Sequence, residues 1–232
     1  MKFVKRVLAS VTTDGLTLAT DHLHVVCDGT TTALRDVSLC FPPGTYAGIH
    51  GVNGSGKSTL ANILLGLGGQ SLAVDGVVSY NGFDIYSPKV SATDRTRLRA
   101  ALFSYVPKVA SLEPTLNVEE NILRPYRLTG RPYDQNRLGD LLDRFNLGDA
   151  RRTDVRQLSS GYQQRVNIVR GLLADAPVLV LDEPTDALDP ANKVFVIDQL
   201  RSYVSRGTVL VVSHEDTGAD RVVELHGGVL AD

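Results

Sequence analysis

The spacing of apolar residues changes within the first third of the chain. Residues 37–41 alternate between apolar and polar, and residues 46–49 form a short apolar run. From Leu60 to Leu67, leucine and isoleucine then recur every three or four residues. Alternation is typical of half-buried strands, and a spacing of three or four residues is typical of a helix. The sequence therefore predicts, in order, two strands, a glycine-rich loop and a helix.

Two compact apolar runs follow in the last quarter of the chain. Residues 178–181 read Val-Leu-Val-Leu and residues 209–212 read Val-Leu-Val-Val, with a helical pattern over residues 192–204 between them. Such runs are typical of parallel strands that are buried on both faces. Residues 76–82 carry an Asn-Gly turn signal of a hairpin. Together these patterns predict an α/β fold.

The middle of the chain, residues 87–158, has a different texture. It is rich in Arg and Asp, it lacks a long apolar run, and Leu138, Leu141, Leu142 and Phe145 stand at helical spacing. We therefore predict a mainly helical insertion between the two halves of the sheet.

The bulk composition is that of an ordinary globular protein. The chain has 232 residues, of which 43% are hydrophobic and 22% charged, and this size suits one domain. A formal net charge of -2 gives no general attraction to nucleic acid, so we expect no nucleic-acid partner.

Three further features bear on location. Cys27 and Cys40 are not spaced as a metal knuckle or a redox pair, which favours a reducing cytoplasm. The basic residues 1–6 precede an apolar stretch that is too short for a signal sequence. No segment approaches the ~18 apolar residues that span a bilayer. In any membrane process, another chain is expected to do the spanning.

Residues 51–58 read Gly-Val-Asn-Gly-Ser-Gly-Lys-Ser and fit the pattern G-x-x-x-x-G-K-[ST] of a P-loop. In this pattern the glycines let backbone N–H groups surround phosphates, the lysine neutralises their charge, and the serine hydroxyl binds Mg²⁺. A solvated lysine in a glycine-rich turn is the plainer alternative, but the position between a strand and a helix favours the P-loop. The nucleotide-binding residues are expected to be Gly51, Asn53, Gly54, Ser55, Gly56, Lys57, Ser58 and Thr59.

Candidate catalytic residues follow the two late apolar runs. Asp182 and Glu183 stand at the end of the first run, where an open α/β sheet binds its ligands. Adjacent carboxylates could equally be a solvated strand end. Beside a P-loop, however, Asp182 suits a Mg²⁺ ligand that acts through the water shell, and Glu183 suits a general base. His214 follows the second run, although a lone histidine is more often structural.

Over roughly residues 33–230 the chain resembles the ABC ATPases. Besides the P-loop, four motifs stand in the order of that family: residues 158–165 (Leu-Ser-Ser-Gly-Tyr-Gln-Gln-Arg), residues 181–185 (Leu-Asp-Glu-Pro-Thr), residues 187–189 (Ala-Leu-Asp) and His214. The first of these is similar to the signature motif that sets this family apart from other P-loop proteins.

The resemblance implies a P-loop NTPase core with a mainly parallel sheet, an antiparallel β subdomain and a helical subdomain. All of residues 1–232 would form one ABC ATPase domain. Residues 1–86 would hold the antiparallel β part and the P-loop part of the core, residues 87–158 the helical subdomain, and residues 159–232 the rest of the core.

The resemblance also implies ATP and Mg²⁺ as ligands, with Ser58 and Asp182 holding the metal. Two cassettes would lie head to tail, each ATP being held between the P-loop of one and the signature of the other. Asp189 would lie at the dimer seam, and His214 would contact the γ-phosphate and the attacking water. The signature residues acting across the dimer would be Ser159, Ser160, Gly161, Tyr162 and Gln163.

The chain departs from the family pattern at several positions. Lys108 stands where family members usually have a glutamine that touches Mg²⁺ and water and couples to the membrane subunit. An ammonium cannot ligate a metal, although it can contact a γ-phosphate. We expect slower hydrolysis or altered coupling, unless Lys108 is only a solvated surface residue.

Two other departures concern the signature and the base. Ser160 and Tyr162 replace the usual glycine and glutamine, while Gly161 is retained, so we expect the signature to function. The aromatic residue that stacks on adenine is expected around residues 24–28, where His24 stacks weakly or apolar contacts alone hold the base.

Two surfaces are candidates for partner docking. Residues 116–122 resemble the family segment near the groove of the membrane subunit. The arginine groups are alternatives, but a charge run is usually a solvated face; they comprise Arg95, Arg97, Arg99, Arg151 and Arg152.

The sequence therefore predicts an ATP-hydrolysing subunit that energises transport through a separate integral membrane permease, by ATP-driven pairing with a second cassette in a homodimer or heterodimer. It would be peripheral on the cytoplasmic face of the membrane. A weakly active nucleotide-binding partner in an asymmetric dimer is an alternative, which Lys108 and Ser160 favour and Glu183 and His214 oppose. A soluble ABC ATPase outside transport is another, although such proteins usually carry a long coiled-coil insertion or two cassettes.

Overall fold

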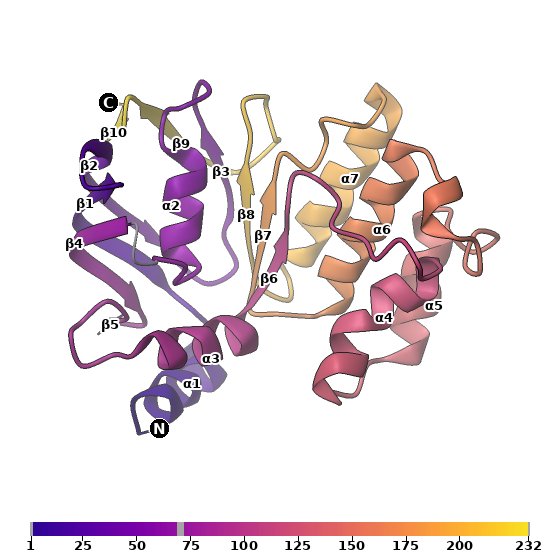
Figure 1. Cartoon of the computed structure of the whole chain (residues 1–232), viewed down its shortest axis with the longest axis horizontal. Coiled ribbons are helices and arrows are strands. Elements are labelled where there is room, and N and C mark those ends of the chain that lie inside the picture. The colour runs from indigo at the N-terminus through magenta and orange to yellow at the C-terminus, as the bar shows by residue number, and fades with distance from the viewer. Residues whose placement is uncertain (1, 69–71, 232) are drawn as a thin grey trace.

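The computed structural model describes residues 2–68 and 72–231 of the chain. Figure 1 shows an antiparallel sheet at one end, a central sheet, and a group of helices at the other end. The helices are α1 (Lys2–Asp14), α2 (Lys57–Leu64), α3 (Ala92–Leu102), α4 (Val118–Thr129), α5 (Gln135–Arg144), η1 (Val155–Gln157), α6 (Ser160–Leu173) and α7 (Pro190–Tyr203). The strands are β1 (Leu18–Cys27), β2 (Thr31–Phe41), β3 (Tyr46–His50), β4 (Leu72–Tyr80), β5 (Phe83–Asp84), β6 (Phe103–Val106), β7 (Val178–Asp182), β8 (Thr208–Val212), β9 (Arg221–His226) and β10 (Val229–Leu230).

The central sheet has six strands in the order β10-β9-β3-β8-β7-β6. All neighbours in it are parallel except β10 and β9. The two late apolar runs are β7 and β8, which lie side by side as predicted. The mainly parallel sheet of an α/β fold is confirmed.

Strands β7 and β8 divide their side chains between two hydrophobic cores. Val180 and Leu210 pack with residues of α2 and of the antiparallel sheet. Leu181 and Val211 pack on the other face with residues of α6 and α7. Successive strand residues point to opposite faces, so an unbroken apolar run is what a strand covered on both sides requires. This covering fixes the strand ends that carry the candidate site.

The antiparallel sheet has the order β2-β1-β4-β5, and the predicted Asn-Gly turn joins its last two strands. Tyr80 pairs with Phe83 across the turn, and Asn81 and Gly82 have φ values of 49° and 77°. Two consecutive positive φ angles are typical of a type I′ hairpin turn. The hairpin prediction is confirmed.

Residues 87–158 are mainly helical, but their first elements pack mainly elsewhere than the later ones. Strand β6 is the edge strand of the central sheet, and α3 packs mainly against α1 and β6, although Arg131 donates a hydrogen bond to the carbonyl oxygen of Ala100 at 2.9 Å. The helices α4 and α5 instead lie against α6, at the far end of the molecule in Figure 1. The proposed subdomain boundary at residue 87 stays a prediction.

Helix α1 was not predicted from the sequence. Its residues Val4 and Val7 are buried, and the rings of Phe3 and Phe83 meet edge to face at 6.1 Å. The signal was a set of apolar residues at helical spacing, which the basic residues around them obscured. Among the described residues, no helix is long and apolar enough to cross a membrane.

Candidate functional site

The loop between β3 and α2 is shaped by its glycines. In Figure 1 it lies at the upper edge of the molecule. Gly51 has φ 146° and Gly56 has φ 100°, a region that side chains with a Cβ rarely adopt. A Cβ on Gly56 would also lie 2.6 Å from the carbonyl oxygen of Ala33. The chain therefore needs glycine at both positions to turn from the strand into the helix.

Lys57 is buried beneath this loop, with 6% of its surface exposed. Its Nζ donates hydrogen bonds to the carbonyl oxygens of Gly51, at 2.7 Å, and Val52, at 2.9 Å. The ammonium is thus held inside the curve of the loop, at the N-terminus of α2. A helix N-terminus and a fixed cation together favour an anion such as phosphate.

A hollow of about 330 Å³ opens beside the P-loop, a size within the range of small-molecule sites. The residues that line it are Thr31, Thr32, Ala33, Asn53, Gly54, Gly56, Lys57, Ser58, Thr59, Lys108, Asp182 and Glu183. Most of the expected nucleotide-binding residues are therefore brought together. Gly51 lines an adjoining hollow instead, and Ser55 is buried, its Oγ having no hydrogen-bond partner among the described residues.

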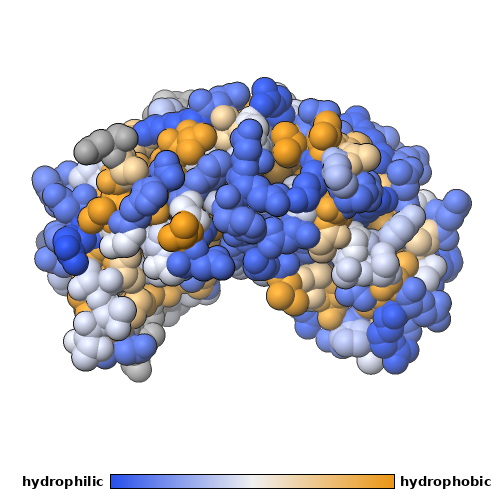
Figure 2. Space-filling model, turned by 90° about the horizontal axis from the view of Figure 1, so that it is seen from above, coloured by the Kyte–Doolittle hydropathy of each residue, from blue (hydrophilic) through white to orange (hydrophobic). Residues whose placement is uncertain are grey.

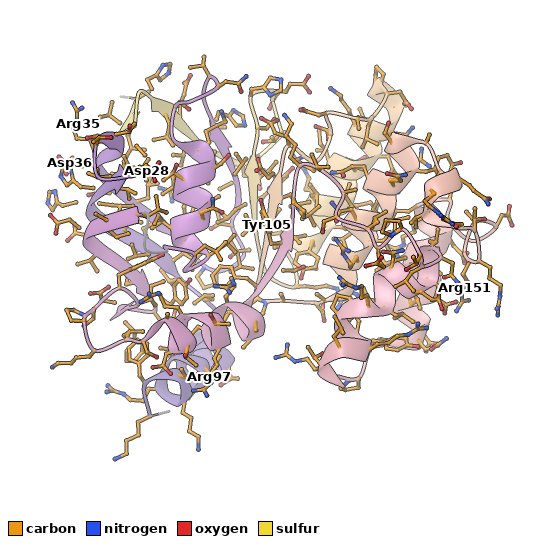
Figure 3. All side chains as sticks on the ribbon, in the orientation of Figure 1. Asp28, Arg35, Asp36, Arg97, Tyr105 and Arg151 are labelled. Carbon is orange, nitrogen blue, oxygen red and sulfur yellow. The ribbon has the colours of Figure 1, made fainter. Side chains whose placement is uncertain are left out.

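Asp182, the last residue of β7, is partly buried at the floor of this hollow. Burial, and then the charge of Glu183, raise the pKa of Asp182, while Lys108 and Lys57 oppose that shift. Tyr105 on the neighbouring strand β6 lies beside Asp182, and burial, followed by the charge of Asp182, raises the pKa of Tyr105; Figure 3 labels this tyrosine near the middle of the molecule. Tyr105 was not predicted, because only the pairing of β6 with β7 brings it to the carboxylate.

The hollow also offers donors that suit Mg²⁺. The Ser58 hydroxyl and the Asp182 carboxylate line the same space, and Mg²⁺ prefers oxygen ligands shared with substrate phosphates. The donor set therefore fits the metal that the sequence predicted.

Glu183 is the most constrained carboxylate of the site. It is 5% exposed and has φ 45°, an uncommon backbone conformation for a residue other than glycine. Its N–H donates to the carbonyl oxygen of Val212 at 2.8 Å. Its Oε2 is buried and has no hydrogen-bond partner among the described residues. An unpaired buried carboxylate oxygen is costly, so this oxygen is placed to receive a hydrogen bond from a ligand or a water molecule.

His214 contacts Glu183 directly, which places the two predicted catalytic residues together. Its Nδ1 lies 3.0 Å from Oε1 of Glu183, and 47% of the His214 side chain is exposed. The hydrogen bond and the charge of Glu183 raise the pKa of His214 above its ordinary value. The glutamate thereby orients the imidazole, and His214 lines the adjoining hollow together with Gly51, Asn53 and Lys108.

Lys108 also faces the site, and its side chain is not simply solvated. Its Nζ lies 2.7 Å from Oδ2 of Asp186, and this contact raises the pKa of Lys108. Asp186 was not predicted as part of the site. Its ligand atom also lies within 4.8 Å of those of Glu183 and His214.

The signature residues form the N-terminus of α6 and do not line the hollow. Ser159 is the N-cap, and its Oγ accepts a hydrogen bond from the backbone N–H of Tyr162 at 3.4 Å. Ser160 is the first residue of α6 and has a helical backbone conformation, which residues with a Cβ adopt without strain. A serine can therefore stand where the family usually has a glycine. Gln163 donates to the carbonyl oxygens of Val155 and Leu158. Within one chain, the signature residues are therefore not part of the P-loop hollow.

Asp189 has a structural function in the single chain. It is the N-cap of α7, and its Oδ1 accepts a hydrogen bond from the N–H of Asn192 at 3.0 Å. This bond lowers the pKa of Asp189. Its position at a dimer seam stays a prediction.

The expected adenine contact near His24 is not part of the hollow. None of residues 24–28 lines it, whereas Thr31, Thr32 and Ala33 at the start of β2 do. Figure 3 labels Asp28 in the turn that separates β1 from β2. The sequence carried no aromatic signal that points to these residues.

The two arginine groups lie apart. Figure 3 shows Arg97 beside α3 and Arg151 at the opposite end of the molecule. Arg97 pairs with Asp94 at 3.6 Å, and Arg151 donates two hydrogen bonds to Glu119 on α4. They do not form one docking surface.

The segment of residues 116–122 is held in a fixed shape by a buried side chain. Asn121 is 0% exposed. Its Nδ2 donates to the carbonyl oxygens of Glu113, Leu116 and Asn117, and its Oδ1 accepts from the N–H of Glu113. Such a satisfied polar anchor orders the loop before α4. Docking of a partner at this segment stays a prediction.

Comparison with known proteins agrees with this geometry. Residues 34–186 match the family model described as ABC transporter. Macrolide export ATP-binding/permease protein MacB 1 of Yersinia pestis bv. Antiqua (strain Antiqua) is 36% identical over 206 residues, which cover 86% of this chain and 31% of that protein. The protein named MacB of Rhodopseudomonas palustris (strain HaA2) is 36% identical over 209 residues, 88% of this chain and 31% of its own length. The chain thus spans about a third of these relatives.

Solved structures show the same likeness. The dimeric structure of MJ0796, a bacterial ABC transporter cassette, superposes with a TM-score of 0.80 at 26% identity, covering 93% of this chain and 97% of that one. An ATP-bound bacterial Atm1-family ABC exporter gives a TM-score of 0.78 at 26% identity, covering 94% of this chain and 38% of the exporter.

Proposed function

The chain belongs to the ABC transporter family of ATP-binding cassettes, and from that premise we propose that it hydrolyses ATP to energise transport through a separate membrane permease. One observation carries the proposal. Glu183, beside the P-loop hollow, is oriented by His214 and keeps a buried, unpaired oxygen. A binding protein without chemistry has no need for such a costly arrangement.

The P-loop supplies binding and position. Backbone N–H groups at the start of α2 and the ammonium of Lys57 hold the phosphates, which replace the two carbonyl oxygens that Lys57 now contacts. Ser58 and Asp182 hold Mg²⁺, which when bound offsets charge on the phosphate oxygens. In phosphoryl transfer, most of the catalytic effect comes from such positioning and charge stabilisation.

Glu183 and His214 act on the attacking water. The unpaired Oε2 of Glu183 accepts a hydrogen bond from that water and takes its proton as the water oxygen attacks the γ-phosphorus, whose bond to the bridging oxygen breaks so that ADP leaves. His214 keeps Oε1 engaged, so that the second oxygen of the carboxylate is the one presented to the water. The exposed side of the imidazole is available to the terminal phosphate.

A second copy of the chain completes the site. In the single chain, Ser159 and Gly161 do not line the hollow, yet they stand at a helix N-terminus that favours phosphate. Support comes from the similarity to a cassette solved as a dimer. Pairing on ATP and separation after hydrolysis then drive the permease, which holds the cassette at the cytoplasmic face of the membrane. The relatives named for macrolide export favour an export system.

Lys108 supports a second candidate, a weakly active member of an asymmetric pair. A lysine cannot ligate Mg²⁺. The contact of His214 with Glu183 argues against this candidate, because the groups that activate water are in place.

Phosphate release from ATP by the purified chain tests the proposed activity. The wild-type chain should release phosphate with a rate that rises with protein concentration, and Lys57→Ala should abolish nucleotide binding and turnover. The permease is tested by isolating the tagged chain from membranes of its source with ATP present, and an integral membrane protein should then be retained in stoichiometric amount. A chain that binds ATP without turnover at any concentration would favour the weakly active alternative.

A further inference from the structure

Lys108 and Asp186 meet because their strands are neighbours. Lys108 follows β6 by two residues, Asp186 follows β7 by four, and β6 and β7 are parallel, so both loops leave the same edge of the sheet. The side chains meet on the rim of the P-loop hollow, with 2.7 Å between Nζ of Lys108 and Oδ2 of Asp186. The ion pair thus joins the loops after β6 and β7, beside the hollow that is proposed to bind the phosphates.

The two lysines that line the hollow differ in how firmly their ammonium groups are held. The site has three carboxylates, those of Asp182, Glu183 and Asp186. Among the described residues that line the hollow, the lysines are Lys57 and Lys108. Lys57 is buried and is bonded to two carbonyl oxygens. The side chain of Lys108 is 52% exposed, and a half-exposed ion pair is weak because water and salt screen it. Lys108 is the lysine that can change its partner at little cost.

We propose that Lys108 and Asp186 form a switch that distinguishes a nucleoside triphosphate from a diphosphate. Without a triphosphate, Lys108 pairs with Asp186. When a triphosphate binds, the ammonium moves to the terminal phosphate, which carries more negative charge than a carboxylate and is presented on the same rim. The switch rests on the proposed function, since it requires the P-loop hollow to hold the triphosphate.

A diphosphate lacks the terminal group and leaves the Lys108–Asp186 ion pair intact. Lys108 then adds to the affinity for a triphosphate only the difference between two contacts of its ammonium, one with the terminal phosphate and one with Asp186. Asp186 therefore competes with the nucleotide for Lys108, and its removal strengthens triphosphate binding.

Asp186 also lies close in sequence to Asp189, which is predicted to lie at the dimer seam. Asp186 is three residues before Asp189, and the turn between them is closed by a hydrogen bond from the N–H of Leu188 to the carbonyl oxygen of Thr185. The signature packs against this turn. A Cβ added to Gly161 would lie only 3.3 Å from the carbonyl oxygen of Ala187. Release of Asp186 from Lys108 thus occurs in the turn that lies against the signature.

Titration calorimetry of the full chain with Mg²⁺ and either ADP or a non-hydrolysable ATP analogue tests the switch. For Asp186→Asn, the analogue should bind about three- to tenfold more tightly, because Lys108 has lost its competing partner. For Lys108→Gln, it should bind about tenfold more weakly, because the charged contact is lost. ADP affinity should change less than about twofold in both variants.

Controls separate the switch from general effects. ADP binding by each variant shows that its P-loop is folded. Lys108→Arg keeps the charge and should keep the preference for the triphosphate. Arg206→Gln breaks an exposed ion pair with Asp175, elsewhere on the molecule, and should bind both nucleotides as the wild type does.

A structure of the complex with the analogue gives the direct readout, in which Nζ of Lys108 should lie on the terminal phosphate. The switch is overturned if that structure retains the Lys108–Asp186 ion pair, if Asp186→Asn fails to tighten binding of the analogue, or if Lys108→Gln weakens both nucleotides equally. A wild-type chain that binds neither nucleotide would instead overturn the proposed function.

Discussion

At the scale of single residues, the chemistry depends on how Glu183 is restrained. The backbone of Glu183 is held at φ 45° by its hydrogen bond to β8, and His214 occupies one of its two carboxylate oxygens. Strain of this kind persists only where the surrounding structure enforces it. The restraint leaves a single oxygen for the water.

Glu183→Gln tests this assignment. The amide keeps the size of the carboxylate but has one acceptor oxygen in place of two and cannot take a proton, so phosphate release should fall by about 10²–10⁴-fold while ATP still binds. Glu120→Gln is the matched control, because glutamine also serves in the capping box of α4. A Glu183→Gln chain that turns over ATP at the wild-type rate would remove Glu183 from the mechanism.

The sequence predicts most residues of the site, but not all. Residues 53–54 and 56–59 lie around the hollow because one continuous loop carries them and its glycines restrict its shape. Tyr105 was not predicted because it reaches the site from the neighbouring strand β6, and Asp186 was not predicted because its partner Lys108 follows that same neighbouring strand. Contacts between strands become visible only after the sheet order is known.

At the scale of elements, the start of α4 shows how the helical part is fastened. The capping box of Asn117 and Glu120 closes the first turn, and Arg151 binds both carboxylate oxygens of Glu119, at 2.8 and 2.6 Å. Acidic residues in a first turn are favourable at the positive end of the helix dipole. The bond to Arg151 lowers the pKa of Glu119 below its ordinary value of 4.5.

Arg151→Gln should therefore cost stability in a way that depends on pH. Since the folded pKa of Glu119 lies below the unfolded one, the ion pair stabilises the chain above about pH 4.5 and loses its effect as the pH falls through the folded pKa. At pH 7 the variant should melt about 2–4 °C below the wild type, and this gap should close toward pH 3.

Thermal unfolding followed by circular dichroism at both pH values checks this prediction. Arg152→Gln, which changes an exposed neighbour, should melt as the wild type does at pH 7. A difference for Arg151→Gln that is the same at pH 7 and pH 3 would mean that the charge of Glu119 is not its cause.

The sequence predicted an element correctly where the element's own residues carry a clear pattern. It missed an element whose burial depends on contacts with other parts of the chain. The run at residues 178–181 indicates a buried strand because it is short, contains two valines and is bounded by Pro177 and Asp182. Helix α1, which was missed, depends on Phe83 and α3 for its burial. Such an element has too little local signal to be recognised without its neighbours.

At the scale of the whole molecule, the signature at the start of α6 lies outside the P-loop hollow of the same chain. Figure 2 shows the molecule from above, on the side of the P-loop, as an arched face covered mainly by hydrophilic residues. Permanent interfaces are usually more hydrophobic. Association across such a face therefore needs the phosphates of a nucleotide between the two copies.

Sedimentation velocity of Glu183→Gln, with and without Mg-ATP, tests most directly whether the site is shared between two copies. We expect a monomer without nucleotide and a dimer with ATP. We also expect that adding Ser159→Arg abolishes the dimer but leaves ATP binding intact, because the signature contacts the partner's nucleotide. A chain that stays monomeric while it binds ATP, or that dimerises equally well with Ser159→Arg, would contradict the shared site.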